Sequence, residues 1–539
     1  MSLCKIKKME EKLNYLNNSL KYFKDPDPFV RATAVSRIME LRNDIPLNMR
    51  RHVLMQILEL SMDKDEFVRM QSAIAIGVLS EAAPRDMQEM VVEKLLEISK
   101  DTEWGIRSHA VIAFGKLKNN IPYHLRDIVV KRVFELTKED KNEVREFASI
   151  ALGNLKFFIP KNMRSNIVKE LLCMSTEDDL KRSALESLST LIDVIPMENK
   201  KEVVERLMKL TRDDAWISTA ASGALGGIGD EIPVNMRRAV IADLLELAQD
   251  KDDDVKRAAI YAMGDLTSII PADMQKHIVD VLLELIEEQY SETVINPVEI
   301  RAAAIKSIGS LNTSIPYDMK RDIIEKILDL TSDKNWRIRS ASALAVGLLL
   351  VNYPDRKCAD SVTRRLLKLM DDPDWHVRSS ALQSAGNVRN EIHKSLFKEV
   401  AQKILQLTYD DNFNVKIPAT EALGKLKNII PKDIREAVTV RIIDMSSDEG
   451  LNVQGSAVWA IGEMGEVIPK NMVDKVISRL LKLGEKGGWE LGRPVARAFG
   501  KLKNIIPHSM GKPVIESLLN LADDPDWDVR RPAVDLLVS

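Results

Sequence analysis

The stretch that decides the fold runs from Asp371 to Val388 and reads DDPDWHVRSSALQSAGNV. Its first eight residues, DDPDWHVR, return almost unchanged as DDPDWDVR between Asp523 and Arg530. Near-identical segments far apart in one chain indicate internal repetition with a fixed period. The stretch is one copy of a unit that continues along the entire chain.

Prolines mark the period, at a step of about 38 residues. Most of them follow an isoleucine, and in the unit between Pro354 and Pro431 a histidine, His393, takes the place of proline. The marking prolines are Pro46, Pro84, Pro122, Pro160, Pro196, Pro233, Pro271, Pro316, Pro354, Pro431, Pro469 and Pro507. A constant step over 539 residues predicts a modular array rather than a single ordinary core.

Each unit reads as two helices. The first begins with aspartates or proline, which suit a helix N-terminus, and small or apolar residues then recur at helical spacing, as at Val144, Ala148 and Leu152. Ile-Pro ends this helix and begins the next, because proline cannot continue a helix but fits the first turn of another. A glycine recurs late in the first helix, for example Gly77 and Gly309. Glycine inside a helix costs about 1 kcal/mol, so its return predicts a close approach of neighbouring helices.

The stretches DPDPFVRATAVSRIMEL, DKNEVREFASIALGNL and DPDWHVRSSALQSAGNV resemble the Asp…Val-Arg…Ala-Leu-Gly helix of HEAT repeats, including the HEAT-like units of bilin lyases. The resemblance covers the whole chain, 1–539, and implies an all-α fold: a right-handed α-solenoid of about fourteen two-helix repeats. It is similar in organisation to the scaffold subunit of type-2A phosphatases. In this family the helix just quoted is the second of its pair and lines the concave side. Residues 1–24 then hold the first helix of the N-terminal repeat, 287–298 an insertion, and 523–539 the final helix.

The arginine of a Val-Arg or Ile-Arg pair lies fifteen residues before six of the marking prolines and before His393. The resemblance implies that these arginines and the nearby aspartates form a structural ladder between adjacent units, since a guanidinium group suits carboxylates and carbonyls. A catalytic site has no reason to recur in every unit. The ladder residues are Arg31, Arg69, Arg107, Arg145, Arg301, Arg339, Arg378 and Arg530; Ser218, Gln454 and Gly492 depart from the pattern.

Composition limits the function classes. The formal net charge is −3, so the chain lacks the overall positive charge that is typical of proteins that bind nucleic acid. The three cysteines are far apart and in no CxxC spacing, which favours a reducing compartment. No signal peptide or membrane span is recognisable, so we expect a cytoplasmic protein without a membrane partner.

Catalytic motifs are missing from the sequence. None of the seven histidines is followed by glutamate, which sets the chain apart from the iron-dependent deoxyhypusine hydroxylases with their related fold. There is no HExxH, phosphate-binding loop or GxSxG segment. The sequence therefore predicts a protein that is not an enzyme and uses no cofactor or metal.

Function is then expected on the concave face, at positions one, two, five and nine residues after the ladder arginine. In the early units these positions carry an apolar strip, which we define as Met70, Ile74, His109, Ile112, Phe147 and Ile150. An exposed apolar strip typically marks a binding groove. The alternative is that tight curvature or a neighbouring helix buries it.

Toward the C-terminal end the equivalent positions carry positive charge. This basic stripe comprises Lys425, Lys427, Arg493, Arg497, Lys501, Lys503 and Arg531, with Trp459 among them. It could accept an acidic peptide, phosphate or RNA. The alternative is a solvated face, because GKLKN recurs in several units as part of the repeat.

The leading interpretation is a non-enzymatic scaffold or adaptor that binds a protein partner along its concave surface. Two alternatives stay open: a bilin lyase or its auxiliary, and a nucleic-acid-binding protein related to the HEAT-like DNA glycosylases. The sequence does not name the partner.

Overall fold

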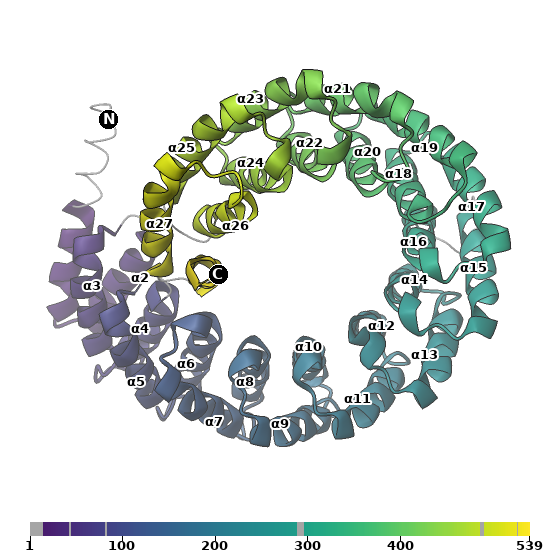
Figure 1. Ribbon diagram of the computed structural model, residues 1–539. Helices are drawn as coiled ribbons and strands as arrows, with labels where there is room; N and C mark the ends of the chain where they lie inside the picture. Colours follow the sequence, from purple (N-terminus) through teal and green to yellow (C-terminus); the bar gives the residue numbers. More distant parts are fainter. Residues whose placement is uncertain are drawn as a thin grey trace. The chain divides into compact units, whose positions relative to one another are not determined.

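The computed structural model describes residues 14–42, 45–80, 83–287, 296–485, 490–524 and 527–538. Over these residues the regular secondary structure consists of α-helices and short 3₁₀ turns, and no strand occurs. Figure 1 shows the helices stacked in pairs along the chain. The predicted α-solenoid of two-helix repeats is confirmed.

The chain divides into two compact units, Met1–Met236 and Arg237–Ser539, with the division inside helix α13 (Val234–Leu247). In the first unit the even-numbered helices lie along the inner side of the curve and the odd-numbered helices along the outer side (Figure 1). The inner helices are α2 (Pro28–Glu40), α4 (Glu66–Leu79), α6 (Trp104–Leu117), α8 (Asn142–Asn154), α10 (Lys181–Thr190) and α12 (Ala215–Ile228). The outer helices are α3 (Leu47–Leu60), α5 (Gln88–Ile98), α7 (Arg126–Leu136), α9 (Lys161–Met174) and α11 (Met197–Leu210).

The second unit repeats this arrangement (Figure 1). Its inner helices are α14 (Asp253–Asp265), α16 (Pro297–Ser310), α18 (Trp336–Leu350), α20 (Trp375–Asn387), α22 (Phe413–Lys425), α24 (Leu451–Met464), α26 (Gly492–Leu502) and α28 (Trp527–Val538). Its outer helices are α15 (Ala272–Glu287), α17 (Tyr317–Leu330), α19 (Arg356–Leu369), α21 (Phe397–Leu407), α23 (Arg435–Met445), α25 (Val473–Gly484) and α27 (His508–Ala522). Within each unit, consecutive inner helices pack against each other, and the inner helices α4 to α12 and α16 to α28 also pack against the outer helix of their own repeat.

Local sequence explains where the helices begin. Asp65 caps α4 by accepting hydrogen bonds from the backbone N–H groups of Phe67 and Val68, and Asp374 caps α20 in the same way through His376. A repeat proline occupies the residue before the outer helix in several repeats, and in others a 3₁₀ turn follows it. Pro46 has an extended backbone, and its carbonyl accepts from the N–H of Met49. The proline therefore turns the chain between the two helices of a repeat.

The repeat glycines lie where successive inner helices come closest. A Cβ atom built on Gly309 would lie 2.8 Å from the Cα of Ala345, and one on Gly347 would lie 2.5 Å from the Cβ of Ser384. Both distances are too short for any side chain without movement of the neighbouring helix. The close approach predicted from the glycine spacing is therefore present in the structure.

Three segments expected from the sequence, the N-terminal helix, the insertion and the final helix, lie partly outside the described residues. Residues 14–21 are helical and are followed by a 3₁₀ turn, Tyr22–Lys24, whereas 1–13 lie outside the described residues. The expected insertion at 287–298 falls between the end of α15 and the start of α16, and most of it, 288–295, is likewise outside the described residues. Helix α28 spans Trp527–Val538 and lies inside the expected final helix at 523–539, of which 525, 526 and 539 are outside the described residues.

Candidate protein-binding surface

One equivalent position on the inner helices carries an isoleucine in three consecutive repeats. It lies three residues before the repeat glycine, and in α4, α6 and α8 it is occupied by Ile74, Ile112 and Ile150. All three side chains are half-buried, so each still presents apolar surface to solvent. Because α4 packs on α6 and α6 on α8, the three isoleucines lie on consecutive helices of one face.

Met70, His109 and Phe147 flank these isoleucines and are also half-buried. Burial and the nearby charge of Lys116 lower the pKa of His109 below its ordinary value. His109 is therefore uncharged at neutral pH and adds no charge to the strip. The structure thus places the six predicted residues of the apolar strip on three neighbouring inner helices, between full exposure and full burial.

At the same register position, several of the middle and later repeats carry charged or amide side chains, whereas α14, α18 and α24 carry Tyr261, Leu344 and Trp459. Glu186, Lys306, Gln383 and Glu421 occupy it in α10, α16, α20 and α22. An aliphatic side chain at this position is therefore not required by the stacking of the helices. Among the described inner helices, isoleucine occupies this position in α4, α6 and α8 alone.

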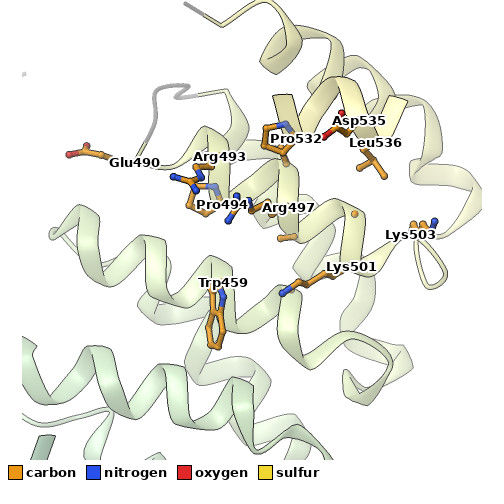
Figure 2. A pocket seen from close by; sticks show the side chains of 14 residues that line it. Trp459, Glu490, Arg493, Pro494, Arg497, Lys501, Lys503, Pro532, Asp535 and Leu536 are labelled. Carbon is orange, nitrogen blue, oxygen red and sulfur yellow. The ribbon is translucent and has the colours of Figure 1, made fainter. Parts of the chain in front are cut away.

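A second surface lies at the C-terminal end of the second unit, where α24, α26 and α28 border a groove of about 750 Å³. Figure 2 shows Arg493, Pro494 and Arg497 along α26, with Trp459 of α24 facing them and Lys501 extending toward the indole. Five predicted residues, Trp459, Arg493, Arg497, Lys501 and Lys503, therefore line one groove. Pro532 and Leu536 of α28 close its other side.

The charges in this groove are only partly compensated. Lys501 forms an ion pair with Glu463 of α24, and its Nζ lies 5.9 Å from the centre of the Trp459 ring. Within the described part of the chain, neither Arg493 nor Arg497 has an ion-pair partner. Glu490 and Asp535 lie at the margin of the groove, and Asp535 is 3.9 Å from Arg531. The groove therefore offers two guanidinium groups to an anion.

The ladder arginines of both units bind carboxylates of the following repeat. Arg31 donates to Asp63 at 2.7 Å and also to the backbone carbonyls of Asp25 and Pro26. The further pairs are Arg69–Asp101 (2.7 Å), Arg107–Glu139 (2.7 Å), Arg145–Glu177 (2.6 Å), Arg301–Asp333 (3.5 Å), Arg339–Asp372 (2.7 Å) and Arg378–Asp410 (2.8 Å). Arg530 donates to the backbone carbonyl of Asp524 at 2.8 Å. These side chains are engaged in stacking and are not available to a ligand.

Two features of the stacking were missed in the sequence. Lys181 occupies the ladder position of α10 and pairs with Asp213 at 2.8 Å, although it is not an arginine. A second set of arginines links the outer helices: Arg132 donates to the hydroxyl and carbonyl oxygens of Ser99, and Arg441 bonds Thr408 in the same way. The two partners of each contact are 33 residues apart, slightly less than one repeat. An arginine recurring at this distance from a serine or threonine could have predicted these contacts from the sequence.

Two kinds of group that can support catalysis are metal-binding clusters and thiols. No group of three or more histidine, cysteine, aspartate or glutamate side chains is placed to hold a metal ion anywhere in the described ranges. Cys173 and Cys358 are both free thiols, and burial raises the pKa of Cys358 to about 11, which disfavours the reactive thiolate. Among the helices that the structure describes, none is long and apolar enough to span a membrane.

Comparisons with known proteins agree with the fold. Residues 270–440, less than half of the chain, match the family model described as "Sister chromatid cohesion protein PDS5 protein". A comparison with curated protein sequences finds no match. Neither the family match nor the structural matches below point to the bilin lyases, and the similarity to the phosphatase 2A scaffold subunit stays a prediction.

Solved structures match over nearly the whole chain. Yeast importin-β (Kap95p) is 13% identical with a TM-score of 0.64, covering 98% of this chain and 74% of that one. Importin-β crystallised from polyethylene glycol is 13% identical with a TM-score of 0.66, covering 92% and 73%. The Kap95:Nup1 complex is 14% identical with a TM-score of 0.56, covering 98% and 83%. At these identities the likeness concerns the fold: the chain is a HEAT-repeat α-solenoid.

Proposed function

We propose that this chain is a non-enzymatic scaffold that binds a protein partner along the inner helices of its first unit. The observation that carries the proposal is the in-register row of Ile74, Ile112 and Ile150, half-buried on three consecutive inner helices. Apolar side chains that keep surface exposed in register are suited to an amphipathic helix or an extended segment of another protein. The Kap95:Nup1 complex supports the proposal, since a solenoid of the same fold is there paired with another protein.

The mechanism is one of shape and repeated weak contacts. Each repeat contributes one apolar side chain at a fixed spacing, so a partner that matches this spacing engages several helices at once. Burying each isoleucine completely removes further apolar surface from water, at about 25 cal/mol per Å². The row therefore favours a partner with apolar residues at a matching repeat.

The test is a quantitative affinity capture from native extract with the triple variant Ile74→Asp, Ile112→Asp, Ile150→Asp. The matched control places aspartate at the same register position where the residue is already polar, Lys306→Asp, Gln383→Asp, Glu421→Asp. We expect the first variant to lose a nuclease-resistant protein partner while keeping its circular dichroism, and the control to retain it. Equal partner recovery by all three proteins would contradict the proposal.

The two alternatives from the sequence are tested separately. A bilin lyase would change the absorption spectrum of added bilin, and no observation in the structure favours it. A nucleic-acid-binding protein would recover labelled DNA or RNA in a salt-dependent manner.

A further inference from the structure

The groove between α24, α26 and α28 combines apolar walls with uncompensated positive charge. Its apolar surface comes from Trp459 on one side and from Pro494, Pro532 and Leu536 on the other. At about 750 Å³ it lies within the size range of clefts that hold compact ligands. An apolar side chain therefore has a place to bind between the indole and the two prolines.

Three cations follow one face of α26. Arg493, Arg497 and Lys501 are spaced at i, i+4 and i+8, so their side chains lie one above another on the helix surface. Like charges at this spacing repel one another and destabilise a helix. Glu463 compensates Lys501 only, so an anion bound at Arg493 and Arg497 relieves repulsion that the chain itself leaves in place.

Comparison with the preceding repeat shows that the arginines are particular to α26. One repeat earlier, α24 carries Gly455 and Trp459 at the positions of Arg493 and Arg497. Stacking of the inner helices does not require a guanidinium group at these positions. The two arginines are therefore free for recognition, where a planar guanidinium group binds a carboxylate through two parallel hydrogen bonds.

We infer that this groove binds an acidic linear segment of a protein that carries an apolar side chain. Carboxylates of the segment pair with Arg493 and Arg497, and the apolar side chain packs against Trp459 and Pro532. The inference deepens the proposed scaffold function by naming the chemistry of one partner, and it rests on that function for its biological meaning. The groove shares no residue with the apolar strip of α4, α6 and α8.

A peptide fits this groove better than a nucleic acid does. Glu490 and Asp535 at the margin repel a continuous phosphate backbone, whereas a short peptide can place its carboxylates between them. Nucleic acid is bound chiefly by many phosphate contacts, whereas the groove offers three cations without an ion-pair partner among the described residues, Arg493, Arg497 and Lys503. An apolar side chain of a peptide can pack against the apolar walls of the groove.

The test measures binding of fluorescent peptides by polarisation at low salt, with the full chain. The probe has the sequence DEFEDE; its comparison peptides are NQFNQN, without charge, and DEAEDE, without the aromatic ring. The test variant is Arg493→Ala, Arg497→Ala. The matched control, Lys475→Ala, Lys482→Ala, removes the same charge from exposed positions of the outer helix α25.

We expect the wild type and the control to bind DEFEDE alike, and the arginine variant to bind at least about 10-fold more weakly, as expected for charge-assisted contacts. NQFNQN should not bind measurably, and DEAEDE should bind about 3- to 10-fold more weakly. The reversal variant Arg493→Glu, Arg497→Glu should lose DEFEDE and gain the basic peptide KRFKRK. This gain distinguishes recognition from a loss of folding, which circular dichroism checks independently.

Several outcomes would overturn the inference: no binding of DEFEDE by the wild type, equal loss in the α25 control, or preference for a labelled RNA 12-mer. Displacement by inorganic phosphate as effectively as by peptide would show a simple anion site instead. The isoleucine triple variant should bind DEFEDE normally. If the isoleucine triple variant binds DEFEDE normally and also still captures the protein partner, the proposal for the apolar strip fails and the inference for the groove stands.

Discussion

The guanidinium group of Arg339 holds the carboxylate of Asp372, 33 residues further along the chain, through Nε and Nη2 at 2.7 and 2.8 Å. The same group donates through Nη1 to the backbone carbonyls of Asp333 and Lys334. One side chain therefore fixes the start of its own helix and the turn of the next repeat. With side chains only 15% and 8% exposed, the pair is shielded from solvent.

We expect the substitution Arg339→Leu to lower the free energy of unfolding by about 3 kcal/mol, because it leaves the Asp372 carboxylate buried without its partner. The measurement is a urea unfolding curve. The matched control is Arg238→Leu, which breaks another contact between repeats, Arg238–Asp273, whose side chains are both 63% exposed. The control should change stability far less. Equal losses would mean that shielding does not matter to the ladder.

Acid should weaken the stacking before it unfolds the helices. Burial alone would raise the pKa of Asp63 and of Asp101, but hydrogen bonds from Arg31 and Arg69 lower both below the ordinary value. A depressed folded pKa stabilises the fold above the unfolded pKa, near 4, and this stabilisation is lost as the pH falls further.

We therefore expect the urea concentration at the midpoint of unfolding to decrease as the pH is lowered from about 4 to about 2. The double variant Asp63→Asn, Asp101→Asn should be less stable than the wild type at pH 7 and show a smaller fall over that range. The same fall in wild type and variant would show that other carboxylates control the acid response.

The repeat glycines allow a paired test of helix packing. Gly309→Ala should destabilise by about 1–3 kcal/mol, because the new Cβ meets the backbone of α18 at Ala345. Gly223→Ala in α12 should stabilise by about 0.5–1 kcal/mol, since nothing lies within 4 Å of its Cβ and alanine favours a helix. Thermal unfolding of both variants checks the opposite signs; stabilisation by Gly309→Ala would refute the close contact.

His109 predicts a pH effect near neutrality. Burial and Lys116 depress its folded pKa below the unfolded value of about 6.5, so the unfolded chain binds more protons as the pH falls. Stability should therefore fall below about pH 6.5. His109→Gln should reduce that fall, as followed by urea unfolding at pH 7.5 and pH 5.5. An unchanged pH dependence would mean that the His109 imidazole has an ordinary pKa in the fold.

The helices and the period of the repeat could be predicted from the sequence because they depend on local interactions. The Asp-Pro helix starts, the Ile-Pro turns and the late glycines each act within a few residues of one another, so their spacing predicts helices and period directly. The order of repeats also places Ile74, Ile112 and Ile150 on one face. The half-burial of these isoleucines depends on how tightly successive helices pack, which spacing does not give.

The sequence by itself determined the period, the two helices of each repeat and the row of arginines, because these follow from interactions within one repeat. Only the tertiary structure decided which charges remain available. Lys501 is compensated by Glu463, 38 residues earlier, while Arg493 and Arg497 are not, and Leu536 of α28 completes the groove. Such pairings depend on the distance and rotation between stacked helices. That geometry arises from packing summed over many side chains, and no short segment encodes it.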